Sequence, residues 1–279
     1  ARRGASPEGV TLQYQILPCA VRLSVEDPRL GGPLHRISNR AAQPAPPLVT
    51  LRYTISGFGP YDVLEEHDRL QRVRSADEAV RLVGHRCGLR VIDRLALGGW
   101  ALVAGAVARV GGRRMLLTGD SGAGKTTLMM RLMHDGFGVE GDAQAVLRGP
   151  SVAALPQPFL LASDIGTLVP EVGAVWNELP TAADDGLRRT FDPGAAGFAW
   201  TIGAGPIDAV IDLEAAHAGR STLRETSPLD ATRRLLARAR ALDTSPEGKA
   251  SLVRACAQLA AGGGYVRRLG TLPEASAAL

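Results

Sequence analysis

The chain has 279 residues, of which 45% are hydrophobic, so it can bury one large core or two smaller ones. Its 32 Lys and Arg residues exceed its 28 Asp and Glu residues, and only 4% of its residues are aromatic. Nucleic-acid-binding proteins concentrate positive charge and stack bases on aromatic rings, so this composition argues against a nucleic-acid partner. No segment approaches the roughly 18 apolar residues of a membrane helix, and no signal-peptide core is present. We therefore expect no membrane partner and a cytoplasmic location, and the richness in Ala, Gly and Arg indicates a bacterial source.

The first 75 residues have the alternating pattern of β-strands. Apolar and polar residues alternate at 10–16 and at 49–55, and breaks containing Pro and Gly separate such runs. Residues 41–47 contain three prolines and are predicted to form a loop. We therefore expect a small β-rich module at residues 1–75.

A helix is predicted to follow this module. Ser75 supplies a hydroxyl N-cap and Glu78 lies three residues further on, as in a capping box. We assign residues 76–100 to a connecting helix and residues 101–279 to a second domain. The cysteines are far apart and odd in number, which fits neither a disulfide framework nor a metal site, so we expect buried thiols. They are Cys19, Cys87 and Cys256.

The second domain opens with two β-prone runs and a glycine-rich segment. The runs lie within residues 101–118 and flank Gly111 and Gly112, which is a hairpin signal. The second run leads directly into the sequence GDSGAGKT at 119–126. Residues 126–135 have helical spacing, and Gly136 is placed to end that helix. Residues 139–146 are predicted to form a strand and a turn.

The rest of this domain continues the alternation of strands and helices. A strand is predicted at 207–213, and Ser227 with Pro228 has the signature of a helix start. We interpret the arginines of this helix as a solvated face rather than a binding site. They are Arg233, Arg234, Arg238 and Arg240. A last helix is expected at 249–259, which completes an α/β fold.

The glycine-rich segment matches the pattern G-x-x-x-x-G-K-[ST] in full, between a predicted strand and a predicted helix. Glycines let several backbone N–H groups converge on phosphate oxygens, and the helix directs its positive end to the same charge. The expected nucleotide-binding residues are Gly119, Asp120, Ser121, Gly122, Ala123, Gly124, Lys125, Thr126 and Thr127. Lys125 would reach the β- and γ-phosphates of a nucleoside triphosphate, and the Thr126 hydroxyl would ligate Mg²⁺.

An acidic residue is expected opposite the γ-phosphate. Asp142 lies seventeen residues after Lys125, at the end of the short apolar run that follows Gly136. In this kind of fold that position neighbours the loop, so Asp142 is a candidate general base or a metal ligand. The alternative is a turn aspartate that binds nearby backbone. Glu140 is a weaker second candidate for the metal.

These residues resemble the HPr kinase/phosphorylase superfamily, and more closely the HPr-kinase-like proteins that include kinases of lasso-peptide precursors. The resemblance rests on the sequence LLTGDSGAGKTTL at 116–128, on Gly136 and on the pair Gly141-Asp142, whose spacings agree with the family pattern. It extends more weakly through residues 154–159 and 208–214, and it covers about residues 102–269. The fold that it implies is a P-loop HPr-kinase-like catalytic domain with the β-rich module before it.

By this resemblance the chain binds ATP and Mg²⁺, and Asp142 takes the proton from the acceptor hydroxyl while Lys125 assists transfer. Three positions depart from the family pattern. Ala143 stands where the family has a second aspartate, the family's histidine is replaced near Ala104, and residues 164–175 lack the segment that engages HPr. We therefore expect a one-way kinase without phosphorylase activity or HPr recognition.

The leading hypothesis is an ATP- and Mg²⁺-dependent kinase whose acceptor is a serine of a peptide or protein, such as a lasso-peptide precursor. Two alternatives stay open: a kinase of small molecules, and a nucleotide-binding regulatory protein that has lost transfer. A transporter-type or helicase-type ATPase is disfavoured, because the sequence has neither a transporter signature nor a second motor domain. Self-association is left open.

Overall fold

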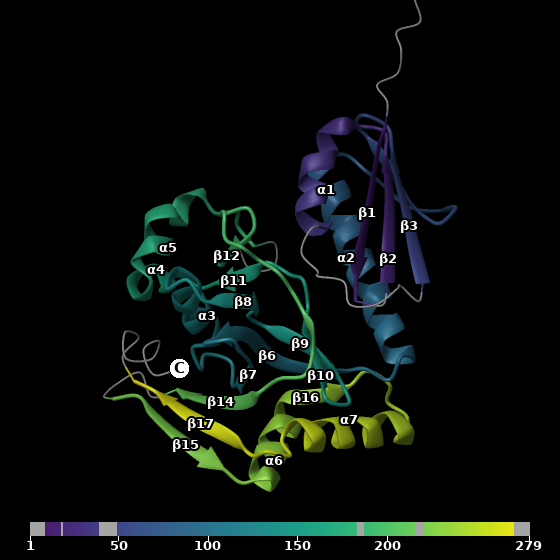
Figure 1. Ribbon diagram of the computed structural model, residues 1–279. Coiled ribbons are helices and arrows are strands. Elements are labelled where there is room, and N and C mark those ends of the chain that lie inside the picture. The colour runs from purple at the N-terminus through teal and green to yellow at the C-terminus, as the bar shows by residue number, and fades with distance from the viewer. Residues whose placement is uncertain (1–8, 18, 39–48, 183–186, 216–219, 271–279) are drawn as a thin grey trace, which may run out of the picture. The chain divides into compact units, whose positions relative to one another are not determined.

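Figure 1 shows the computed structural model, which describes residues 9–17, 19–38, 49–182, 187–215 and 220–270. The chain divides into two compact units, Ala1–Leu97 and Gly98–Leu279. The loop predicted at 41–47 lies outside the described residues. Among the described helices, none combines the length and the apolar character that crossing a membrane requires.

The first unit is a five-stranded sheet with helices. Its elements are β1 (Val10–Ile16), β2 (Cys19–Val25), the 3-10 turn η1 (Pro28–Leu30), α1 (Gly31–Ser38), β3 (Val49–Ser56), β4 (Tyr61–Glu65), β5 (Asp68–Val73) and α2 (Ala76–Leu97). The strands lie in the order β1-β2-β3-β4-β5, and all neighbours are antiparallel except the parallel pair β2 and β3. The two strands predicted from alternation, at 10–16 and 49–55, are β1 and β3.

Helix α2 covers this sheet through one apolar stripe. Its buried residues recur every four positions, so they lie along a single face of the helix. They are Ala79, Val83, Cys87, Val91 and Leu95. This face packs against β2, β3 and β4. The capping signal is also present, because the Ser75 hydroxyl accepts a hydrogen bond from the backbone N–H of Glu78 at 3.2 Å.

The second unit contains one large mixed sheet with helices around it (Figure 1). The strands of the unit are β6 (Ala101–Val110), β7 (Arg113–Gly119), β8 (Gly138–Gly141), β9 (Gln144–Arg148), β10 (Ser151–Ala154), β11 (Phe159–Leu161), β12 (Arg189–Phe191), β13 (Ala204–Gly205), β14 (Ala209–Ala215), β15 (Thr222–Thr226), β16 (Ala239–Ala241) and β17 (Gly264–Leu269). Strands β11 and β12 form a separate two-stranded sheet. The helices of the unit are α3 (Lys125–His134), α4 (Ile165–Leu168), α5 (Pro170–Val175), the 3-10 turn η2 (Trp176–Glu178), α6 (Pro228–Arg238) and α7 (Pro246–Leu259).

The large sheet has the strand order β13-β10-β9-β6-β7-β14-β17-β15, and β8 and β16 also pair with β6. Strands β6 and β7 form the predicted hairpin, and both Gly111 and Gly112 have the positive φ that a tight hairpin turn requires. Strand β7 is parallel to β14, and β14 is parallel to β17. Strand β7 therefore lies at the centre of the sheet, and its carboxyl end leads into the glycine-rich segment.

The core of this unit fixes both ends of that segment. Leu116 and Leu117 on β7 and Leu128 and Met129 on α3 have no exposed surface. Burial of such a side chain stabilises a fold by about 1.5–3 kcal/mol relative to its exposure. The strand before the segment and the helix after it are thus both anchored, which holds the turn between them in place.

In the second unit the sequence predicts the start of α6 correctly, whereas α7 begins earlier than predicted. The Ser227 hydroxyl accepts from the N–H of Asp230 at 3.2 Å and Pro228 is the first residue of α6, as predicted. The last helix was expected at 249–259, but α7 begins at Pro246. The reason is a second cap of the same kind, in which the Ser245 hydroxyl accepts from the N–H of Gly248 at 3.0 Å. The three cysteines are free and buried, as expected.

Candidate functional site

The glycine-rich segment is a tight turn from β7 into α3. Gly119 has a φ of +146°, and a Cβ there would lie 2.7 Å from the carbonyl oxygen of Leu213 on the neighbouring strand β14. Gly124 caps α3 with a φ of +89°. Residues other than glycine rarely adopt either backbone conformation, so the turn requires glycine at both positions. The turn exposes Asp120, Ser121 and Gly122 and buries Ala123.

The N-terminus of α3 has the properties of an anion site. No side chain of the described residues caps it, so the N–H groups of its first turn are not satisfied by a side-chain acceptor. The aligned peptide dipoles add positive potential at the same end. Lys125, Thr126 and Thr127 form the first turn and are half-buried. Positive potential and unsatisfied donors therefore face the same turn.

Lys125 folds back over the turn. Its Nζ donates to the carbonyl oxygens of Gly119 and Asp120, at 2.8 Å in both cases. Burial lowers the pKa of Lys125 below its usual value, and the nearby guanidinium of Arg238 lowers it further. The ammonium group is thus held at the glycine-rich turn by neutral acceptors, which a fully charged anion would displace.

Thr126 and Asp142 lie beside each other. The Thr126 hydroxyl donates to Oδ2 of Asp142 at 2.8 Å, and Asp142 is only 2% exposed. Its other oxygen, Oδ1, is buried and has no hydrogen-bond partner among the described residues. Burial raises the pKa of Asp142 to about 6, although the hydrogen bond from Thr126 acts in the opposite direction. The structure thus brings the candidate base into contact with the loop helix, sixteen residues apart in sequence.

The Thr126–Asp142 pair fits a divalent cation. Mg²⁺ prefers oxygen ligands and usually keeps several waters while it binds one or two protein oxygens and the substrate phosphates. The hydroxyl of Thr126 and the unpartnered Oδ1 of Asp142 offer two such oxygens at the edge of the turn. The described residues contain no cluster of three or more His, Cys, Asp or Glu side chains that would hold a metal alone. A cation here would therefore depend on phosphate and water for its remaining ligands.

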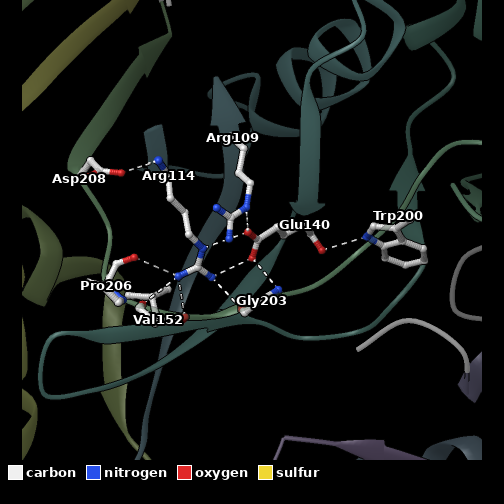
Figure 2. A network of polar contacts seen from close by, with 9 residues as sticks. Arg109, Arg114, Glu140, Val152, Trp200, Gly203, Pro206 and Asp208 are labelled. Atoms are coloured by element: carbon white, nitrogen blue, oxygen red, sulfur yellow. Dashed lines mark hydrogen bonds and ion pairs between the residues drawn. The ribbon is translucent and has the colours of Figure 1, made fainter. Parts of the chain in front are cut away.

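Glu140 does not belong to this metal site, which corrects our interpretation of it as a second candidate ligand. Figure 2 shows its carboxylate in contact with two arginines, Arg109 and Arg114. Arg114 donates from Nε at 2.9 Å and from Nη2 at 2.7 Å, Arg109 donates from Nε at 3.0 Å, and the N–H of Gly203 donates at 3.1 Å. A buried carboxylate with these donors is committed to ion pairs and is not available to a metal.

The partner of Glu140, Arg114, connects several segments of the unit. Its side chain is 5% exposed, and Nη1 donates to the carbonyl oxygens of Val152, Gly205 and Pro206 at 3.0, 2.8 and 3.3 Å. Nη2 also donates to the carbonyl of Gly203 at 2.8 Å (Figure 2). Each of its three nitrogens has an acceptor. Arg114 and Glu140 together fix β8, the strand that ends immediately before Asp142.

The structure adds a second aspartate that sequence reasoning gave no role. Asp212 on β14 is 3% exposed, and its Oδ1 accepts from the Thr118 hydroxyl at 2.9 Å, just before the glycine-rich turn. Its Oδ2 accepts from Arg234 at 2.8 Å. The available signal is an aspartate between the apolar residues Ile211 and Leu213 of β14, because a buried charge needs a partner.

Two arginines of α6 also differ from expectation. We interpret all four as a solvated face of one helix; Arg233 is exposed, whereas Arg240 is exposed but lies on β16, after the helix has ended. Arg234, however, pairs with the buried Asp212, and Arg238 pairs with Asp120 in the turn. Sequence spacing alone did not predict this, because the partners lie on strands and turns far away in sequence. The helix therefore brings two cations toward the glycine-rich turn.

These features define a mixed α/β protein whose central strand, glycine-rich turn and helix carry a lysine, a threonine and a buried aspartate. A scan against protein-family models and a search of curated proteins found no match. Among solved structures, the chain is similar to the Hpr(Ser) kinase/phosphatase from Coxiella burnetii, with 14% identity and a TM-score of 0.28 over 45% of this chain and 76% of that chain. A similarity at this level establishes neither a shared fold nor a shared activity.

Proposed function

We propose that this protein binds ATP with Mg²⁺ at the turn of residues 119–126 and transfers the γ-phosphoryl group to a hydroxyl. The observation that carries the proposal is the position of Asp142, whose buried carboxylate accepts from the Thr126 hydroxyl through Oδ2 at the start of the loop helix and has no hydrogen-bond partner at Oδ1 among the described residues. A glycine-rich turn, a lysine, a hydroxyl and an acidic residue are the recurring parts of phosphoryl-transfer sites. The location that we propose is the cytoplasm, where ATP is available.

Each part of the site has a role in this reaction. The backbone N–H groups of the turn and of α3 bind the phosphates, because aligned peptide dipoles favour negative charge there. Lys125 leaves the carbonyls of Gly119 and Asp120 and binds the β- and γ-phosphates, since a charged acceptor is stronger than a neutral one. Thr126 and Asp142 would hold Mg²⁺, which neutralises charge on the phosphates.

Asp142 also accepts the proton of the acceptor hydroxyl. The hydroxyl oxygen forms a bond to the γ-phosphorus, the bond from that phosphorus to the bridging oxygen breaks, and ADP leaves. In the metal-free protein burial raises the pKa of Asp142 to about 6, so this carboxylate is a stronger base than an exposed aspartate and is still ionised at neutral pH. The proton, the phosphoryl group and the leaving group are all accounted for without another side chain.

The acceptor that we propose is a serine of a peptide or protein, such as a lasso-peptide precursor. This choice rests on the family resemblance alone. Ala143, which replaces the family's second aspartate, contributes only its carbonyl, which accepts from the N–H of Gly105 at 3.1 Å. A single carboxylate suits transfer in one direction, and a small-molecule acceptor is the alternative within the same chemistry.

The test compares Asp142→Asn with the parent protein and with Asp164→Asn, a matched change at an exposed aspartate of the same unit. Calorimetry with Mg²⁺ measures ATP affinity, and γ-labelled ATP with candidate serine peptides measures transfer. We expect Asp142→Asn to bind ATP and to lose transfer by at least 100-fold, which is typical of the loss of a general base. Transfer at the parent rate by Asp142→Asn would refute the assignment.

The same experiment addresses a second candidate function. The missing second aspartate motivates a nucleotide-binding regulatory protein that has lost transfer. Tight ATP binding by the parent without labelled product from peptides, small molecules or a cell extract would favour that function over a kinase. The absence of heat with any nucleoside triphosphate would exclude both.

A further inference from the structure

A second cation reaches the glycine-rich turn from the C-terminal end of α6. Arg238, the last residue of that helix, donates from Nη2 to Oδ2 of Asp120 at 2.8 Å, and Nη1 donates to the other oxygen of the same carboxylate. The two residues are 118 positions apart in sequence. The guanidinium thus binds the turn in the paired geometry that it also uses for phosphate.

The ion pair between Arg238 and Asp120 is expected to contribute little to the stability of the fold. Asp120 is 76% exposed, and ion pairs at such positions add at most about 1 kcal/mol of stability. Arg238 itself is only 23% exposed, and its buried Nε has no hydrogen-bond partner among the described residues, its ion pair with Oδ1 of Asp212 being 3.9 Å long. Arg114 shows the contrast, because all of its guanidinium nitrogens have acceptors. Arg238 is ordered by burial, yet it is only partly satisfied.

Arg238 also approaches a like charge. Arg238 binds the carboxylate of Asp120, and Nζ of Lys125 donates to the backbone carbonyl of the same residue, so both cations contact one position of the turn. Two cations that converge on one exposed turn repel each other, and the carboxylates of Asp120 and Asp212 offset this repulsion, the latter from 3.9 Å between its Oδ1 and Nε of Arg238. A polyphosphate in the turn would add negative charge beside both cations.

We propose that Arg238 is a ligand of the terminal phosphate of a nucleoside triphosphate. In the nucleotide-free protein the carboxylate of Asp120 holds Arg238 at the turn, and the phosphate replaces this carboxylate when the nucleotide binds. This inference rests on the proposed function, because it requires a triphosphate in the turn. Carboxylate and phosphate present equivalent oxygen pairs to a guanidinium, so the exchange needs rotation of side chains and no change of fold. Asp120 then competes with the terminal phosphate for Arg238, which binds either of them.

This arrangement predicts opposite effects for the two members of one ion pair. Arg238→Ala removes a ligand of the terminal phosphate, so ATP affinity is expected to fall by at least tenfold while ADP affinity changes by less than threefold. Asp120→Asn removes the competitor, so ATP affinity is expected to rise several-fold. Arg238→Lys keeps the charge without the paired geometry and is expected to lie between Arg238→Ala and the parent. The control is Arg233→Ala, an exposed arginine of the same helix.

The measurement is calorimetry of Mg-ATP and Mg-ADP with the full chain and these variants, and their unfolding midpoints check that each is folded. If the ion pair only braces the turn, both Arg238→Ala and Asp120→Asn weaken ATP and ADP alike, which would overturn the inference. An unchanged ratio of ATP to ADP affinity in Arg238→Ala would also overturn it, while the proposed function stands if the parent binds ATP. A parent that binds neither nucleotide would refute both.

Discussion

Replacing Asp142 by Asn is expected to remove the loss of stability that ionisation of this buried carboxyl causes in the nucleotide-free and metal-free protein as the pH rises. Burial raises the pKa of this carboxyl from its usual value near 3.8 to about 6, so the folded state binds its proton more tightly than the unfolded state. Stability from this group is therefore present at low pH, falls as the pH rises from about 4 to about 6, and is constant above that range. Asn has no proton to lose and shows no such fall.

The size of the effect follows from the same pKa. A tenfold change in proton affinity corresponds to about 1.4 kcal/mol, so ionised Asp142 costs about 3 kcal/mol of unfolding free energy at pH 8. About half of this cost is already present at pH 5, where the unfolded state is mostly ionised. The amide of Asn leaves a buried N–H group in place of Oδ1, which costs about 1–3 kcal/mol at every pH. The difference between the two pH values is therefore the informative quantity.

The assay is denaturant unfolding of the parent, Asp142→Asn and the exposed control Asp164→Asn at pH 5 and pH 8, in the presence of a chelator. Other carboxylates contribute equally to all three proteins and cancel. Between pH 5 and pH 8 the parent is expected to lose about 1.5 kcal/mol more than Asp142→Asn, whereas Asp164→Asn follows the parent. An identical pH dependence for the parent and Asp142→Asn would show that Asp142 is not buried as described.

Three other substitutions test the fold around the site. Gly119→Ala places a Cβ 2.7 Å from the Leu213 carbonyl, so a lower unfolding midpoint and lost ATP binding in calorimetry are expected, and parent values for both would contradict the turn geometry. Arg114→Met leaves the buried Glu140 with the partly exposed Arg109 and the N–H of Gly203 as its remaining donors, so denaturant unfolding is expected to show a loss of about 3–5 kcal/mol, and a loss below 1 kcal/mol would contradict the network. Leu128→Ala leaves a cavity beneath α3 and is expected to cost about 2–5 kcal/mol in the same assay, while a change within error would mean that the helix is not anchored there.

Sequence reasoning succeeded where the determinant is local. Alternation defined β1, capping serines defined the starts of α2 and α6, and paired glycines defined the hairpin of β6 and β7. The glycine pattern also located the turn at 119–126, because backbone conformation there depends on residue type. The spacing of Asp142 from Lys125 placed its carboxylate near the turn, and the structure shows it bonded to Thr126.

Sequence reasoning failed where the determinant is a contact between distant segments. Glu140 is a candidate metal ligand by sequence because it precedes Asp142 by two residues, yet its carboxylate binds Arg114 on another strand. Arg238 is predicted to be a surface residue because its helix has a polar face, yet it binds Asp120 in the turn after β7. Residue type and helical spacing carry no information about such partners, since strand order in the sheet decides which side chains meet.

The anchoring of residues 203–206 by Arg114 limits how this protein can vary in length. Connections between elements usually accept inserted residues, because little of their backbone is buried or bonded. Here the carbonyls of Gly203, Gly205 and Pro206 bind one guanidinium, and the N–H of Gly203 binds Glu140. One inserted residue would displace these groups from the guanidinium of Arg114, whose position is fixed by β7. Related chains are therefore expected to keep this connection at constant length, although it contains only the two-residue strand β13.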